Sequence, residues 1–200
     1  MENILLSQNG IDIYESDIMI LCDEYISRLP DSNSVYKSAV FAGMLRYIYS
    51  HKLKYVIETD KINRNAKQNN YKLLDDIFNN IYIYLCSLYN IVPSIIQFCV
   101  LVDIDNTTVS DINKGIFRTD GSKANPANSQ TVKKWYATCE SMLLSKAQNE
   151  SSIGSIFALK ANYGYRDNFQ QVEMIPAQQT QSVDQIKERY KSAQLPVMDD

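Results

Sequence analysis

The sequence predicts an all-α fold: a helical bundle that contains a helix-turn-helix unit and ends in a flexible C-terminal tail. Apolar residues recur at intervals of three and four through most of the first 165 residues, which is the spacing of one helical face. After Asp167 the composition shifts to glutamine with few apolar residues, so burial there cannot offset the entropy of ordering. At 200 residues and 45 % hydrophobic content, the chain is long enough to bury a core.

The pattern of residues 1–50 predicts a pair of N-terminal helices. The first helix runs from Glu15 to Leu29 and stops at Pro30. The second, from about Ser34 to Ser50, is apolar around most of its girth, which favours burial on several sides. Residues 51–71 then lose the helical pattern and predict a solvated basic linker, with some helix near Tyr55 to Ile62. Six basic residues fall between His51 and Lys72, against Glu58 and Asp60: Lys52, Lys54, Lys61, Arg64, Lys67 and Lys72.

Residues 72–167 predict the helix-turn-helix and oligomerisation helices. The strongest apolar stripe runs from Leu74 to Tyr89. An exposed loop over residues 119–130 precedes a helix from about Thr131 to Ala147. A shorter helix follows from Ser152 to Tyr163, with Gly164 placed for a left-handed C-terminal cap.

Residues 168–200 predict a mobile tail that carries a short helix. Ser182 can cap a segment with Val183, Ile186 and Tyr190 at helical spacing. Such a segment is typical of a docking peptide, although a marginal helix without a partner has nearly the same pattern.

The segment from Pro93 to Gly115 has the layout of a helix-turn-helix. Ile104 is expected to plug the turn, and Asp105 or Asn106 to cap the second helix. The residues expected to face the core are Ile95, Phe98, Cys99, Val102, Val109 and Ile112.

The second helix of this unit carries the candidate DNA-binding residues. Short polar side chains early in a rigid helix can reach base edges in the major groove. The candidates for base contact are Asn106, Thr107 and Thr108, and we expect Ser110 and Asn113 to face DNA beside them. The candidates for phosphate contact are Lys114, Arg118 and Lys123. Asp103, Asp105 and Asp111 oppose these cations, so we expect weak binding by one copy and useful binding by several. On pattern alone, a purely structural scaffold remains open.

Two motifs resemble those of phage terminase small subunits. Phe98, Ile104, Thr107, Thr108 and Gly115 match that family's helix-turn-helix pattern, although Asp103 and Ile112 stand where glycine and tryptophan are common. The stretch from Gly154 to Asp167, with Ile-Phe-Ala-Leu-Lys running into Gly-Tyr-Arg-Asp, is similar to the ending that these proteins share. Together the motifs cover roughly residues 72–167.

The resemblance implies a non-catalytic DNA-recognition subunit of a viral genome-packaging terminase, acting in the host cytoplasm. Such a subunit binds the packaging start site on double-stranded DNA and regulates the large ATPase/nuclease subunit. It also implies a homo-oligomer, most simply a ring. For this chain, the resemblance implies that six residues lie in the core or at a subunit interface, and we favour the core: Trp135, Met142, Leu143, Ile156, Phe157 and Leu159.

Other classes find less support in the sequence. There is no phosphate-cradling Gly-x-x-x-x-Gly-Lys loop, no Gly-x-Ser-x-Gly elbow and one histidine, His51, so we expect neither an enzyme nor a cofactor. The scattered cysteines predict buried thiols rather than a metal site, and no apolar run is long enough for a membrane helix.

A net charge of −3 and a pI near 5.2 are unusual for a nucleic-acid partner. The alternatives are a helix-turn-helix transcription regulator, for which a two-fold dimer is expected, and a structural phage protein that uses the motif only for packing. The mass in solution separates a dimeric regulator from a larger ring.

Overall fold

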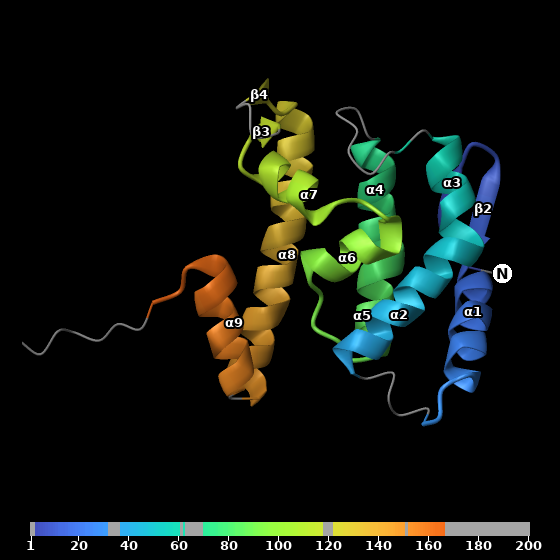
Figure 1. Cartoon of the computed structure of the whole chain (residues 1–200), viewed down its shortest axis with the longest axis horizontal. Helices are drawn as coiled ribbons and strands as arrows, with labels where there is room; N and C mark the ends of the chain where they lie inside the picture. The colour runs from blue at the N-terminus through green and yellow to red at the C-terminus, as the bar shows by residue number, and fades with distance from the viewer. Residues whose placement is uncertain are drawn as a thin grey trace, which may run out of the picture. The chain divides into compact units, whose positions relative to one another are not determined.

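The computed structural model describes residues 3–31, 37–60, 62, 70–117, 122–150 and 152–166. These residues are mostly helical, as the sequence predicts, and two short antiparallel hairpins accompany the helices (Figure 1). Residues 1–164 form one compact unit. The predicted mobile tail, residues 168–200, lies outside the described residues.

The chain opens with a β-hairpin that the helical pattern did not predict. Strand β1 spans Ile4–Gln8 and pairs with β2, Ile11–Tyr14, with Gln8 opposite Ile11. The two residues between the strands, Asn9 and Gly10, both have positive φ, as the tight turns of two-residue hairpins require. Ile13 is fully buried, so the hairpin contributes to the core.

Helix α1 (Glu15–Ser27) follows the hairpin directly. The Asp17 carboxylate accepts a hydrogen bond from the backbone N–H of Tyr14 at 3.0 Å, which satisfies a donor at the helix start. The next helical run begins with α2 (Ser38–Ile48) and passes through one π-helical segment, η2 (Tyr49–Leu53), into α3 (Lys54–Thr59).

The stretch expected as a basic linker, residues 51–71, therefore begins as helix rather than as a loose connection. Leu53, Val56 and Ile57 are buried, and so is Ile62. The ammonium groups of Lys52 and Lys54 are on the outside of this helix, where Lys52 forms an ion pair with Asp17 at 2.9 Å and Lys54 lies 3.9 Å from Glu58. The apolar residues between the lysines keep the helical spacing, and their burial outweighs the high local charge.

The strongest predicted stripe is confirmed as a helical run from Tyr71 to Leu88. It comprises α4 (Tyr71–Ile77), the π-helical segment η3 (Phe78–Tyr82) and α5 (Ile83–Leu88). Asn70 caps its start by accepting a hydrogen bond from the backbone N–H of Leu73 at 3.1 Å.

The remaining elements form the second half of the compact unit. They are α6 (Ile95–Val102), α7 (Asn106–Asn113), β3 (Ile116–Phe117), β4 (Ser122–Lys123), α8 (Pro126–Glu150) and α9 (Ile153–Tyr163). Figure 1 shows α6 between α2 and α8, both of which it contacts. Helix α9 turns back along α8.

In this half, the sequence predicts the end of α9 correctly and the start of α8 incorrectly. Helix α8 begins at Pro126, inside the stretch predicted as a loop, because proline suits a first turn and Asn125 accepts a hydrogen bond from the N–H of Ala127 at 2.9 Å. The predicted cap at Gly164 is confirmed: its φ is 74° and its N–H bonds to the carbonyl of Leu159.

The burial expected on α8 is confirmed for Trp135 and Leu143, whereas Met142 is half-buried, and the burial expected on α9 is confirmed only in part. Trp135 and Leu143 of α8 are buried, and so is Leu159 of α9. Ile156 and Phe157 are exposed, so core packing is wrong for these two residues. Helix α9 packs on α8, and Phe157 is on the exposed part of its surface.

An aromatic cluster joins α6 and α8 to the α4–η3 run. Phe98 of α6 makes edge-on contacts with Phe78 of η3 and with Trp135 of α8, each with ring centroids 5.0 Å apart. Phe78 and Trp135 stack at 5.5 Å. The indole N–H of Trp135 donates a hydrogen bond to the Asp75 carboxylate at 2.7 Å. This hydrogen bond orients the Trp135 ring, in addition to the packing of the rings against one another.

Because these helices meet at Trp135, we predict that Trp135→Ala strongly destabilises the chain. Truncating a buried tryptophan costs about 3–5 kcal/mol, a large share of the roughly 5–15 kcal/mol of a typical domain. Urea unfolding followed by circular dichroism measures the change. Tyr55→Ala is the control, because Tyr55 is 68 % exposed and its loss should fall within about 0.5 kcal/mol. Equal midpoints for the two variants would contradict the central role of Trp135.

Candidate nucleic-acid interface

Hydrogen bonds from the core fix where α6 begins. The buried hydroxyl of Tyr82 accepts a hydrogen bond from the N–H of Ser94 at 2.7 Å and donates to the Ser94 carbonyl at 2.8 Å. The side-chain amide of Gln97, itself buried, donates to the Ser38 hydroxyl at 2.8 Å. These bonds hold the first turn of α6 against η3 and α2, so α6 has a defined position in the core.

A tight turn joins α6 to α7. Asp103 has a φ of 50°, in the left-handed region, and the N–H of Ile104 bonds to the carbonyl of Cys99 at 3.1 Å. Ile104 is buried, as predicted for the residue that plugs the turn. The Asp105 carboxylate accepts a hydrogen bond from the N–H of Thr107 at 2.9 Å and caps α7, one of the two caps that the sequence allows.

Helix α7 packs on the body through one apolar face and leaves a polar face outside. Val109 and Ile112 are buried. Thr107, Asp111 and Lys114 follow one another at intervals of four and three, so they share the face opposite. Thr107 and Lys114 are exposed, and Asp111 is half-buried between them. This outer face of α7, defined by Thr107, Asp111 and Lys114, is the surface best placed for a ligand.

The other residues that are expected to face DNA differ in their exposure. Asn106 is exposed, whereas Thr108, Ser110 and Asn113 are half-buried. Ser110 is hydrogen-bonded to the Tyr136 hydroxyl of α8. Burial raises the pKa of Tyr136, and the bond with Ser110 offsets part of that rise. Ser110 thus has a role in fixing α7 against α8 that spacing along the chain did not indicate.

A small β-hairpin follows α7 at once. Ile116 of β3 pairs with Lys123 of β4, and the N–H of Ala124 bonds to the carbonyl of Gly115 at 3.1 Å. Gly115 has a φ of 76°, a conformation that glycine adopts without steric cost. The hairpin places Lys123 at the end of α7 rather than in a free loop. Arg118, the remaining predicted phosphate contact, lies outside the described residues.

Several lysines on α8 and beside α7 have no ion-pair partner among the described residues. Lys114 and Lys123 are exposed, and neither forms an ion pair with another residue that the structure describes. The same holds for Lys133 and Lys134 on α8, which the sequence motif did not include. Lys133 and Lys134 lie about 10 Å from Pro126 along the axis of α8. Their position in the first turns of the helix that follows the hairpin is the sequence signal that could have identified them.

The basic stretch near the N-terminal half is partly neutralised instead. Lys52 is paired with Asp17, and Lys54 lies 3.9 Å from Glu58 one turn away. Lys61, Arg64 and Lys67 lie outside the described residues. Lys37 and Lys72 are also exposed and have no ion-pair partner among the described residues, so the lysines around α7 are candidates for phosphate contact because of their position beside its outer face.

The described residues offer neither a metal site nor a membrane-spanning helix. No group of three or more histidine, cysteine, aspartate or glutamate side chains among them could hold a metal ion. No described helix is long and apolar enough to cross a membrane.

Comparison of the chain with protein-family models, with curated proteins and with solved structures finds no match.

All four cysteines are buried, and we predict that they resist modification in the folded protein. Burial raises the pKa of Cys22 to about 11 and those of Cys86, Cys99 and Cys139 to about 12. Since only the thiolate reacts, iodoacetamide at about pH 8 should label these cysteines no faster than the chain unfolds. Mass spectrometry over time measures the labelling, with the urea-unfolded chain as the reference. Rapid labelling of any one cysteine in the native protein would show that the core is open there.

Proposed function

We propose that this chain is the non-catalytic DNA-recognition subunit of a viral genome-packaging terminase, which binds the packaging start site and regulates the large ATPase/nuclease subunit. The observation that carries the proposal is the outer face of α7. It stands on a rigid, capped helix, it presents Thr107 and Lys114 to solvent, and it continues into a hairpin that bears Lys123. In a helix-turn-helix protein, the second helix enters the major groove in this way.

Two further features support the same proposal. The turn between α6 and α7 is closed by a buried Ile104, which gives the pair the rigidity that base reading needs. The resemblance of two motifs to terminase small subunits supplies the packaging role. In that role the chain acts as a homo-oligomeric ring of a phage, on double-stranded DNA in the host cytoplasm.

Several copies acting together would explain how an acidic chain binds DNA. Asp103 is exposed beside the turn, and Asp111 lies between Thr107 and Lys114 on α7, so each copy offers few net positive charges to phosphate. Linking weak sites in one oligomer raises the overall affinity without new contacts at any one site. The proposal therefore needs self-association as well as DNA binding.

The lysines beside α7 provide the direct test. Lys114→Glu combined with Lys123→Glu should weaken binding to duplex DNA about tenfold and lower the slope of log affinity against log salt by about one for each phosphate that is no longer neutralised. Fluorescence anisotropy over a salt series measures both quantities.

Lys54→Glu combined with Lys72→Glu is the matched control for this experiment, because it makes the same charge change at two exposed positions, on α3 and α4. If the control and the double variant lose affinity equally, net charge rather than the α7 surface governs binding. If neither loses affinity, α7 is not the contact surface.

A second prediction concerns Asp111, which places a carboxylate within the outer face of α7. Asp111→Asn keeps the shape of the side chain and removes its repulsion of phosphate, so affinity for duplex DNA should rise several-fold at low salt and less at high salt. Asp76→Asn on α4 is the control. An unchanged affinity for Asp111→Asn, measured in the same salt series, would mean that DNA does not approach this face.

A further inference from the structure

Two contacts hold the end of α7 beside the first turns of α8. The N–H of Ala124 bonds to the carbonyl of Gly115, which ties the chain just before α8 to the chain just after α7. Further along both helices, Ser110 is hydrogen-bonded to the Tyr136 hydroxyl. Figure 1 shows β3 and β4 next to the start of α8, with α7 close by. The segments between these two contacts therefore lie close to one another.

Three lysines lie between the two contacts. Lys123 ends β4 and directly precedes Ala124. Lys114 follows Ser110 by one turn of α7, and Lys133 precedes Tyr136 by one turn of α8. Residues three or four apart share a helix face. Lys114 and Lys133 are therefore on the sides of α7 and α8 that approach each other, and both are displaced from the Ser110–Tyr136 bond toward the hairpin.

The next residue along α8, Lys134, is on a different side of that helix. Successive residues of an α-helix are turned by about 100°, so Lys133 is about 60° from Tyr136 around the axis and Lys134 about 160°. Both lysines are exposed. They have the same charge and similar surroundings in sequence, but only Lys133 is on the side of α8 that faces α7.

The charges at the two ends of α7 are opposite in sign. At its start, Asp103 is exposed in the turn and the Asp105 carboxylate caps the first residues. At its end, Lys114, Lys123 and Lys133 are exposed, and none of them forms an ion pair with another described residue. A phosphate is repelled by the first group and attracted by the second. The backbone of a nucleic acid is therefore favoured at the end of α7 next to the hairpin.

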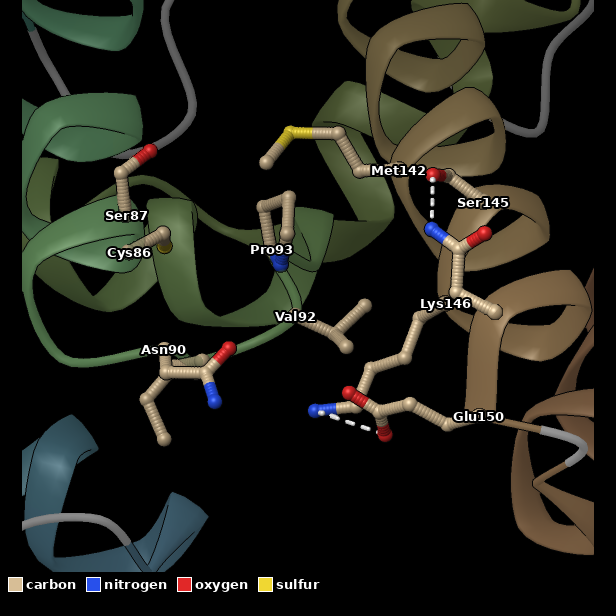
Figure 2. Close-up of a pocket in the computed structure, with 11 residues that line it drawn as sticks. Cys86, Ser87, Asn90, Val92, Pro93, Met142, Ser145, Lys146 and Glu150 are labelled. Carbon is tan, nitrogen blue, oxygen red and sulfur yellow. Dashed lines mark hydrogen bonds and ion pairs between the residues drawn. The ribbon is translucent and has the colours of Figure 1, made fainter.

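The surroundings of Lys133 on α8 also leave it available. No acidic residue lies within four positions of it in the sequence. The situation of Lys146, in the last turns of α8, is different: it lies 3.7 Å from Glu150, and Figure 2 shows this ion pair. A phosphate that approached Lys146 would compete with the Glu150 carboxylate, whereas no described carboxylate competes for Lys133.

We propose that Lys133 binds the phosphate backbone of DNA together with Lys114 and Lys123, so that one DNA strand crosses from α7 to α8 beside the hairpin. The inference rests on the proposed function and extends the contact surface to α8. It also states where the backbone passes, at the end of α7 next to the hairpin rather than at the turn after α6. Contacts to phosphate of this kind set the orientation of a protein on the duplex.

The matched pair Lys133→Gln and Lys134→Gln provides the first test. Affinity for a DNA duplex of mixed sequence is measured by fluorescence anisotropy over a salt series. Lys133→Gln should weaken binding several-fold at low salt and lower the slope of log affinity against log salt by about 0.9, the value for one lost phosphate contact. Lys134→Gln should change neither quantity. Equal losses in the two variants, or no loss in Lys133→Gln, would overturn the inference.

A second test leaves the protein unaltered. The lysines are reductively methylated with and without excess duplex DNA at low salt, and the extent of reaction at each lysine is measured by mass spectrometry. DNA should protect Lys133 together with Lys114 and Lys123, and Lys134 should react at the same rate in both samples. Protection of Lys114 and Lys123 without Lys133, or equal protection of Lys133 and Lys134, would overturn the inference.

The same measurements separate this inference from the proposed function. If the wild-type chain binds duplex DNA and the double variant of Lys114 and Lys123 loses affinity while Lys133→Gln does not, the role of α8 is refuted and DNA binding by α7 stands. If the wild-type chain binds no duplex DNA at low salt, the proposed function and this inference both fail.

Discussion

The packing of Trp135 against Phe78 and Phe98 holds the helices that carry these residues in position. Each of the three rings comes from a different helical segment, and the indole N–H is directed at Asp75. Phe98 fixes α6, and the same helix that carries Trp135 also holds α7 through Tyr136 and Ser110. The orientation of α7, and with it the surface that it offers, is therefore set by packing in the core rather than by α7 itself, which is only eight residues long.

Helices with one continuous apolar stripe could be predicted from the sequence, because a helix packed on one side leaves a period of 3.6 residues. The runs from Tyr71 to Leu88 and through Trp135 are of this kind. Where charge and burial compete, the pattern misleads: residues 51–71 are rich in charged and amide side chains, yet Leu53, Val56 and Ile57 are buried. The Asn9–Gly10 pair is a local hairpin signal, but the strands beside it, of five and four residues, are too short to show a clear alternation of apolar and polar residues.

The candidate site was predicted better in its backbone than in its surroundings. The turn at Ile104, the cap at Asp105 and the burial of Val109 follow from local chemistry. The bond between Ser110 and Tyr136 joins residues that are far apart in sequence, and no local pattern reveals it. The exposure of Phe157 was missed for a related reason. Periodicity tells which residues share a face; it does not tell whether that face is covered.

Photo-cross-linking would show most directly whether the outer face of α7 meets duplex DNA. A photoreactive side chain is placed at Thr107 and, for comparison, at Thr59 near the end of α3. We expect DNA to cross-link to the chain modified at position 107, excess salt to abolish the product, and position 59 to give none. Cross-linking at position 59 with none at position 107 would refute DNA binding by α7, because DNA would then bind elsewhere on the molecule.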